Sequence, residues 1–298
     1  MRGARRALSE PRVAWSGALL LLLALAAAAA PAIAVLLGAD AETVDLYRRL
    51  APPSLAHPLG TDELGRDLLL RLLDGGRVSL LVGITAAIAA AGLGTAIGVT
   101  AGYRGGRLDA LLMRLTDGII ALPLLPLLVV LAAIDLAKLG LPAALVQSEA
   151  ASLYRIIVLV ALVGWTTVAR LVRGATLSLR AQDFIRAATA LGATPGRIML
   201  VHILPNLARP IIVATTLSVG QIILLESVLS FLGLGIAPPL PSWGNMLTGA
   251  QETVEFAPQL ALYPGLLIFV TVIACNILGD GLQDALDPRG PRRSSAYS

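Results

Sequence analysis

Runs of about 20 apolar residues constrain this chain more than any other feature of its sequence. A helical run of that length matches the hydrocarbon thickness of a bilayer. Only 14% of the 298 residues are charged, whereas a soluble domain carries about a quarter. A membrane β-barrel would instead need segments of about 10 residues that alternate in polarity, and the chain lacks that pattern. The sequence therefore predicts an all-α, polytopic membrane helix bundle.

The apolar runs predict about six transmembrane helices, which we place at 15–37, 78–102, 111–136, 153–172, 211–234 and 260–278. An even number of spans puts both termini on one side of the membrane. Arginines are concentrated in the N-terminal segment, the second and fourth loops and the tail, whereas the other loops balance arginines with acidic residues. The positive-inside rule therefore predicts that both termini and these two loops are cytoplasmic.

These spans divide the chain into four parts. Residues 1–37 would form a cytoplasmic N-terminus and a first membrane anchor, 38–77 an extracytoplasmic segment with an amphipathic helix, 78–282 a core membrane domain with a cytoplasmic loop at 174–209, and 283–298 a cytoplasmic tail. The first span contains AAAPAIA, which resembles a signal-peptide cleavage site. Its apolar run is longer than that of a signal peptide, so we expect a retained anchor.

Three local patterns predict loop structure and packing. Leucines cluster on one face of residues 61–76, which predicts an amphipathic helix on the outer membrane surface. The prolines of residues 237–243 predict a loop at the outer mouth, with Trp243 at the membrane interface. Gly94, Gly98 and Gly102 recur once per helical turn and allow another helix to approach closely. For these glycines we favour a packing seam within the chain over a dimer interface.

The chain lacks the sequence of a loop that cradles the phosphates of ATP. Such a loop needs a lysine followed by serine or threonine, and the one lysine, Lys138, precedes Leu139. Coupling to an ion would instead favour carboxylates or histidines inside the membrane. Asp117 and Glu226 are the carboxylates clearly inside the predicted spans, away from their ends. Glu226 could line a transport pathway, or it could be a carboxylate satisfied within the bundle near its outer end.

A metal site is not expected. His57 and His202 are the two histidines, and the predicted topology places them on opposite sides of the membrane.

The predicted fourth loop, residues 173–209, is long for a connection between helices of a compact bundle. Residues 183–191 have the alanine and leucine content of a helix, and Gly192 can end that helix in a left-handed conformation. A second short helix can begin at Pro195, and Pro205 would close the segment. This pair of helices could rest on anionic lipid, or it could dock into a soluble partner through small side chains on one face.

The same segment resembles the EAA coupling loop of ABC-importer permeases. The residues that fit the pattern are Ala187, Ala188, Gly192, Ile198, His202, Leu204 and Pro205, and Leu191 shares a helix face with the two alanines. Arg186 stands where the family has glutamate, so a salt bridge from that acid is not carried over. Residues 57–83, 230–247 and 278–289 also look like the C-type subunit of dipeptide, oligopeptide and nickel permeases.

The resemblance implies a type I ABC importer permease in the bacterial inner membrane. This chain would pair with a second homologous permease, two ATPase subunits would bind the cytoplasmic loops, and an extracytoplasmic binding protein, which residues 61–76 could contact, would deliver the solute. The partner ATPases would bind ATP and Mg²⁺, and this chain would hold no cofactor and do no covalent chemistry. Dipeptides, longer peptides, nickel chelates and glutathione-like compounds all remain open as solutes.

Two other functions fit parts of the sequence. A membrane scaffold could use residues 186–206 to recruit a cytoplasmic protein without transport. An ion-coupled carrier would depend on Glu226 and would work without any ATPase.

Overall fold

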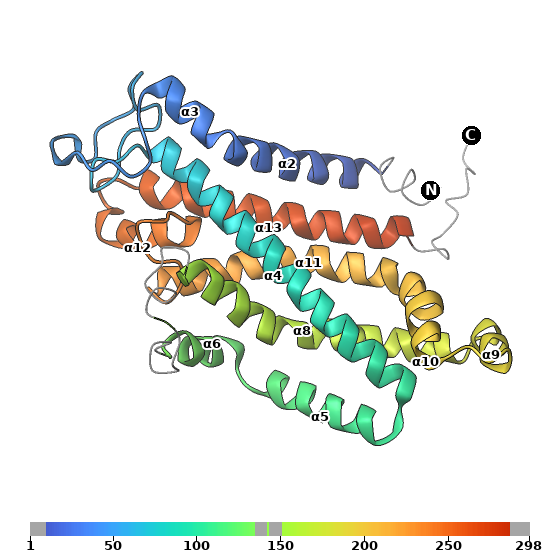
Figure 1. Cartoon of the computed structure of the whole chain (residues 1–298). Helices are drawn as coiled ribbons and strands as arrows, with labels where there is room; N and C mark the ends of the chain where they lie inside the picture. The colour runs from blue at the N-terminus through green and yellow to red at the C-terminus, as the bar shows by residue number, and fades with distance from the viewer. Residues whose placement is uncertain (1–9, 135–141, 143–150, 287–298) are drawn as a thin grey trace, which may run out of the picture.

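The computed structural model describes residues 10–134, 142 and 151–286, and its long helices lie side by side in an elongated bundle (Figure 1). The prediction of an all-α fold is confirmed, because the regular structure in these ranges is helical apart from one isolated bridge. In chain order the elements are α2 (Pro11–Ala28), α3 (Ala30–Leu37), η1 (Leu46–Arg48), α4 (Leu68–Arg104), α5 (Gly106–Ala121), α6 (Leu124–Ala132), α8 (Ala151–Arg180), α9 (Asp183–Ala190), α10 (Pro195–Arg197), η3 (Ile198–Ile203), α11 (Leu204–Phe231), α12 (Trp243–Thr253) and α13 (Gln259–Leu286).

The helices match the predicted number of spans. Five are long and apolar enough to cross a membrane, and α5 with α6 gives a sixth crossing if this bent pair acts as one span. The two helices of the pair meet at 89°. Leu122 and Pro123 between them are extended, because a proline disfavours the helical conformation of the residue before it. The predicted span 111–136 therefore contains a break, and its last two residues lie outside the described part of the chain.

We call the two ends of the bundle the α12 end and the α9 end, after the short helix that each one carries (Figure 1). The α12 end also holds α3 and the connecting segment 38–67, whereas α9 and α10 lie at the opposite end. The predicted first span, 15–37, is two helices, α2 and α3, joined at Ala29. Pro31 lies in the first turn of α3, where its missing N–H costs the least.

The predicted amphipathic helix at 61–76 is wrong. Residues 61–67 form a turn closed by a bridge between Thr61 and Asp67, and α4 begins only at Leu68. The Asp67 carboxylate caps α4 by accepting a hydrogen bond from the Leu70 N–H at 2.8 Å. The leucines after it belong to the first turns of a 37-residue helix, where Leu68, Leu70 and Leu72 are buried in the bundle and the other two are half-buried. They pack against other helices rather than against a membrane surface.

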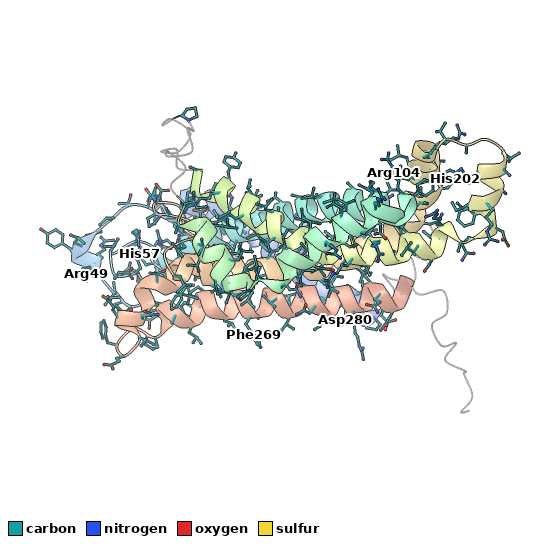
Figure 2. All side chains as sticks on the ribbon, turned by 90° about the horizontal axis from the view of Figure 1, so that it is seen from below. Arg49, His57, Arg104, His202, Phe269 and Asp280 are labelled. Atoms are coloured by element: carbon teal, nitrogen blue, oxygen red, sulfur yellow. The ribbon has the colours of Figure 1, made fainter. Side chains whose placement is uncertain are left out.

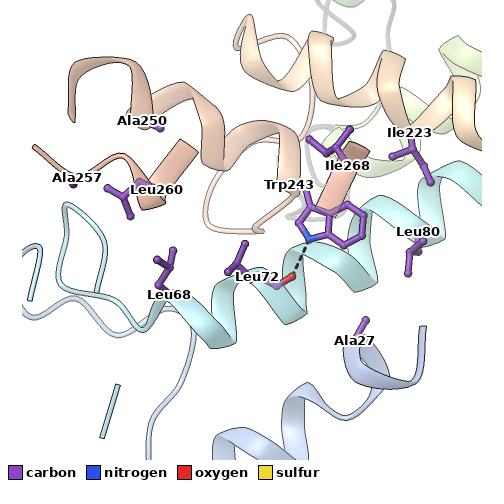
Figure 3. Close-up of a cluster of buried hydrophobic side chains, with 10 residues drawn as sticks. All are labelled: Ala27, Leu68, Leu72, Leu80, Ile223, Trp243, Ala250, Ala257, Leu260 and Ile268. Atoms are coloured by element: carbon purple, nitrogen blue, oxygen red, sulfur yellow. Dashed lines mark hydrogen bonds between the residues drawn. The ribbon is translucent and has the colours of Figure 1, made fainter. Parts of the chain in front are cut away.

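Trp243 is also placed differently from the prediction. It is only 2% exposed, and its indole N–H donates to the Leu72 carbonyl of α4 at 2.9 Å (Figure 3). Gly75 and Gly76 give it room, since an added Cβ at either glycine would lie 3.0–3.4 Å from atoms of the Ser242–Trp243 stretch. The first residue of α12 therefore anchors this helix in a buried apolar cluster, and its ring is not exposed to a membrane surface.

The glycine spacing in α4 forms a packing seam within the chain, as predicted. A Cβ at Gly94 would lie 2.5 Å from the Trp165 carbonyl oxygen, and one at Gly98 would lie 2.6 Å from that of Ala169. Gly102 continues the seam against Thr176. α4 and α8 can approach this closely only because these positions carry no side chain.

Candidate functional site

α9 is the short helix that the sequence predicted after the fourth span, and it lies beyond the ends of the long helices (Figure 1). α8 runs further than predicted, to Arg180, so the connection that precedes α9 is short. Ile185 points into the protein and is 3% exposed. Phe184 and Leu191 are 44% and 89% exposed, and Ala187 between them is exposed too. These three residues are spaced by three and four positions and therefore present one small apolar face.

A bend follows α9 at the glycine that the sequence indicated. Gly192 has φ +80°, a left-handed conformation that ends a helix at little cost for glycine. The Ala193 N–H bonds back to the Ala188 carbonyl at 3.1 Å, which closes the last turn. The Thr194 hydroxyl then accepts from the Arg197 N–H at 3.4 Å and starts the next helix.

Pro205 does not close the segment as predicted. The chain passes from α10 through a π-helical turn, η3, straight into α11, and Pro205 lies in the first turn of α11. Because the chain is already helical before it, Pro205 lacks a backbone donor inside a continuous helix, directly after the π-helical turn. π-Helical turns recur at functional sites. The Asn206 side-chain amide also donates a hydrogen bond to the His202 carbonyl oxygen at 2.7 Å, so this oxygen has a hydrogen-bond partner. The fifth membrane helix is therefore continuous with the bend after α9.

An apolar cluster ties α9, α10 and η3, together called the α9 segment, to the bundle. Its buried members are Ile185 of α9, Ile198 and Ile203 of η3, Leu207 of α11, Val99 of α4, and Val168 and Val172 of α8. A displacement of α9 would therefore act on three long helices through one cluster.

The predicted coupling residues fall into three groups by exposure. Arg186, Ala187, Leu191, Gly192 and Pro205 are exposed, Ala188, His202 and Leu204 are half-buried, and Ile198 is buried. Within the described part of the chain, Arg186 forms its ion pair with Asp183 of its own helix, at 3.7 Å, and both side chains are exposed. Sequence reasoning missed Phe184 on the exposed face and Ile185 as the anchor. An isolated pair of large apolar residues outside the spans was the signal that could have found them.

Glu226 of α11 is fully buried, which fits the interpretation as a carboxylate satisfied within the bundle. Its Oε1 accepts from the Ser230 hydroxyl at 2.7 Å, and its Oε2 accepts from the Ser79 hydroxyl of α4 at 3.1 Å. Each hydroxyl in turn accepts a backbone N–H, that of Ile236 at 3.0 Å and that of Trp243 at 3.2 Å. The carboxylate thus organises the contact of α4, α11 and the start of α12, and in this structure it lines no open surface.

Two carboxylates of α5 are paired with arginines of α8. Asp117 of α5 accepts from Arg170 of α8 at 2.5 Å, and Asp109 accepts two hydrogen bonds from Arg173 at 2.5 and 2.7 Å. His57 contacts Asp67 at the α12 end, whereas His202 lies at the α9 end (Figure 2). The two histidines are therefore too far apart to share a metal ion.

The family model described as "binding-protein-dependent transport system inner membrane component" matches residues 94–290 of the 298. The chain belongs to this family. The matched residues begin in the glycine seam of α4 and include the whole α9 segment and Glu226, whereas the 38–67 segment precedes them. The features at the α9 end therefore lie within the part that this permease shares with its family.

Three curated relatives agree with the predicted branch of that family. Glutathione transport system permease protein GsiD of Pectobacterium atrosepticum is 40% identical over 255 residues, which cover 85% of this permease and 80% of the relative. Oligopeptide transport system permease protein OppC of Bacillus subtilis is 38% identical over 250 residues, covering 84% and 77%. Dipeptide transport system permease protein DppC of Alkalihalophilus pseudofirmus is 42% identical over 241 residues, covering 81% and 75%.

Proposed function

We propose that this chain is a permease subunit of an ATP-driven importer of dipeptides or oligopeptides, and that ATPase subunits drive it through the α9 segment. It would form the pathway with a second homologous permease and receive solute from an extracytoplasmic binding protein. The names of its relatives support peptide transport, and the family description supports dependence on a binding protein.

The observation that carries the coupling role is the exposed apolar face of α9. Burying a side chain such as Phe184 or Leu191 in an interface is worth about 1.5–3 kcal/mol, whereas an exposed ion pair such as Asp183–Arg186 contributes at most about 1 kcal/mol. An ATPase would therefore hold α9 by apolar contact, and the arginine in place of the family's glutamate need not weaken docking.

The orientation that this role requires agrees with the distribution of charge. At the α9 end, Arg104 and Arg107 flank the α4–α5 connection and Arg186 and Arg197 lie in the α9 segment. Arg104 and His202 mark this end in Figure 2. The 38–67 segment at the other end mixes arginines with Asp40, Glu42, Asp45, Asp62 and Glu63. The positive-inside rule supports a cytoplasmic α9 end and an extracytoplasmic α12 end.

The anchor cluster gives a route for the movement. When two ATPases close on ATP, they would carry α9 with them, and Ile185 would transmit the displacement to α4, α8 and α11. Rigid-body motion of packed helices is a common way to switch a site between two faces of a membrane.

Substitution of Leu191 by aspartate tests the docking. In the assembled transporter, we expect Leu191→Asp to lower the amount of ATPase that co-purifies with the tagged chain at least tenfold, and to lower ATP-dependent uptake of labelled alanyl-alanine in parallel. The reason is the lost burial together with the new charge that the interface would have to desolvate.

Leu55→Asp is the matched control, because Leu55 is 99% exposed but belongs to the 38–67 segment. It should leave ATPase recovery unchanged. Recovery at the wild-type level with Leu191→Asp would contradict the coupling role and favour a face that rests on lipid. Normal ATPase recovery with uptake of a nickel chelate or glutathione, but not of the dipeptide, would keep the coupling role and correct the solute.

A further inference from the structure

A cavity of about 480 Å³ lies where the break between α5 and α6 faces α8 and α11 (Figure 1 shows these helices). Its volume is in the range of about 300–1,000 Å³ that small-molecule sites occupy. It is distinct from the α9 segment and from the buried Glu226, neither of which lines it.

α8 and α11 each turn one helix face toward this cavity. Ser218, Gln221 and Leu225 of α11 are spaced by three and four residues, so they share one side of that helix. Val163 and Thr167 of α8 are likewise one turn apart and line the opposite wall. The cavity is therefore built by the packing of the bundle and does not depend on a single loop.

The third wall of the cavity is formed at the break between α5 and α6, where the helical backbone is interrupted. α5 ends at Ala121, and its last carbonyl groups have no donor further along the helix, although the Leu122 N–H still bonds to the Ile119 carbonyl at 3.2 Å. Non-helical backbone at membrane depth is tolerated where protein covers it or where it lines a water-filled cavity. Here Ile119, Ile120 and Leu122 line the cavity, so the freed carbonyl groups are at its edge.

The polar groups of the lining are neutral. Among the described residues that line the cavity none is charged, and the polar side chains are those of Thr166, Thr167, Ser218 and Gln221. The Ser218 hydroxyl donates to the Ala214 carbonyl at 2.8 Å, so its oxygen can accept a further hydrogen bond. Gln221 is exposed, and its carboxamide offers both a donor and an acceptor.

We propose that this cavity binds the backbone amide of a peptide solute during transport, with the Gln221 carboxamide as the principal contact. A carboxamide is complementary to a peptide bond, because each can donate to and accept from the other. The surrounding leucine and isoleucine walls would accept side chains of different shapes without a specific contact. This inference rests on the proposed function and names the group that would recognise its solute.

The test compares two solutes that differ in one N–H. Uptake of labelled alanyl-alanine and of its ester analogue alanyl-lactate is measured with the reconstituted transporter, at solute concentrations that saturate the binding protein. We expect Gln221→Leu to lower the maximal uptake of alanyl-alanine about tenfold, the effect of one buried hydrogen bond. Uptake of the ester should fall at most about twofold, because the ester has no N–H that could donate a hydrogen bond to the Gln221 carboxamide oxygen. Gln251→Leu, on an exposed glutamine of α12, is the control and should change neither.

The outcomes separate this inference from the proposed function. If the wild-type transporter takes up neither alanyl-alanine nor longer alanine peptides, peptide import and this site are both overturned. If wild type transports one of these peptides and Gln221→Leu is indistinguishable from wild type, the site alone is overturned, and the partner permease or lipid covers the cavity. An equal loss of uptake for both solutes, accompanied by loss of ATP hydrolysis, would assign Gln221 a purely structural role and would also overturn the site.

Discussion

At the α12 end, three helices meet around a buried carboxylate and two serine hydroxyls, whereas at the α9 end a short helix is held to three long ones by a single apolar cluster. Buried hydrogen bonds are directional and costly to leave unmade, so the network around Glu226 specifies one arrangement. Apolar contacts tolerate small displacements, and α9 has an exposed face. This difference is what the proposed coupling role requires, namely an α12 end that stays fixed and an α9 end that an ATPase can displace.

The largest expected effect comes from removing the buried carboxylate. Glu226→Ala leaves the Ser79 and Ser230 hydroxyls without their acceptor and opens a small cavity, so we expect the free energy of unfolding to fall by about 3 kcal/mol. Denaturant unfolding of the detergent-solubilised protein, followed by tryptophan fluorescence, measures this. Glu252→Ala, an exposed carboxylate of α12, should have little effect. Equal stability of the two variants would show that the α12 end does not depend on its polar network.

A smaller effect is expected at the bend after α9. Gly192→Ala forces a residue with a Cβ into φ +80°, although no atom within 4 Å would meet that Cβ, so the cost is backbone strain of about 1 kcal/mol. We expect the affinity for the ATPase to fall about fivefold. Gly196→Ala is matched to it, because that position is equally open but lies in a helix. Its affinity should be unchanged, and equal losses in both variants would argue against a specific bend.

The smallest effect concerns the turn at Asp40 in the 38–67 segment. Hydrogen bonds from the Thr43 hydroxyl and from the Thr43 and Glu42 N–H groups hold the pKa of this carboxyl below its usual value. A carboxyl whose pKa is lower in the folded state stabilises the fold above about pH 4, and this contribution is lost as the pH falls through the depressed pKa. The protection of the Thr43 amide, which is its exchange rate relative to the intrinsic rate at the same pH, should therefore fall on acidification in wild type and lose that dependence in Asp40→Asn. An unchanged dependence would place the sensitive group elsewhere.

Much of the fold follows from local rules that the sequence displays. Apolar run length predicted the spans, the spacing of Gly94, Gly98 and Gly102 predicted the α4–α8 seam, and alanine content with Gly192 predicted α9 and its bend. Each of these depends on nearby residues or on a helical period, so no knowledge of distant partners was needed.

The errors concern contacts that join distant segments. The start of α4 at Leu68 and the burial of Trp243 depend on each other, because α12 packs onto the glycines of α4 across more than 160 residues of sequence. Pro205 was wrongly predicted to end the second short helix, because amino-acid composition gives no sign of the π-helical turn before it. At the candidate site, Ala187 was found by resemblance and Leu191 by its helical spacing from the two alanines, whereas the anchor Ile185 became visible only through its buried partners.

Labelling of the two ends from outside the cell tests the central claim most directly. Cys275 is the only cysteine and is buried, so Leu55→Cys and Leu191→Cys in a Cys275→Ala background each provide one exposed thiol, at the α12 and α9 ends respectively. With a membrane-impermeant maleimide added to intact cells, we expect labelling of Leu55→Cys alone, and labelling of Leu191→Cys only after the membrane is permeabilised. Labelling of Leu191→Cys in intact cells would place α9 outside, where no ATPase could move it, and would contradict the account.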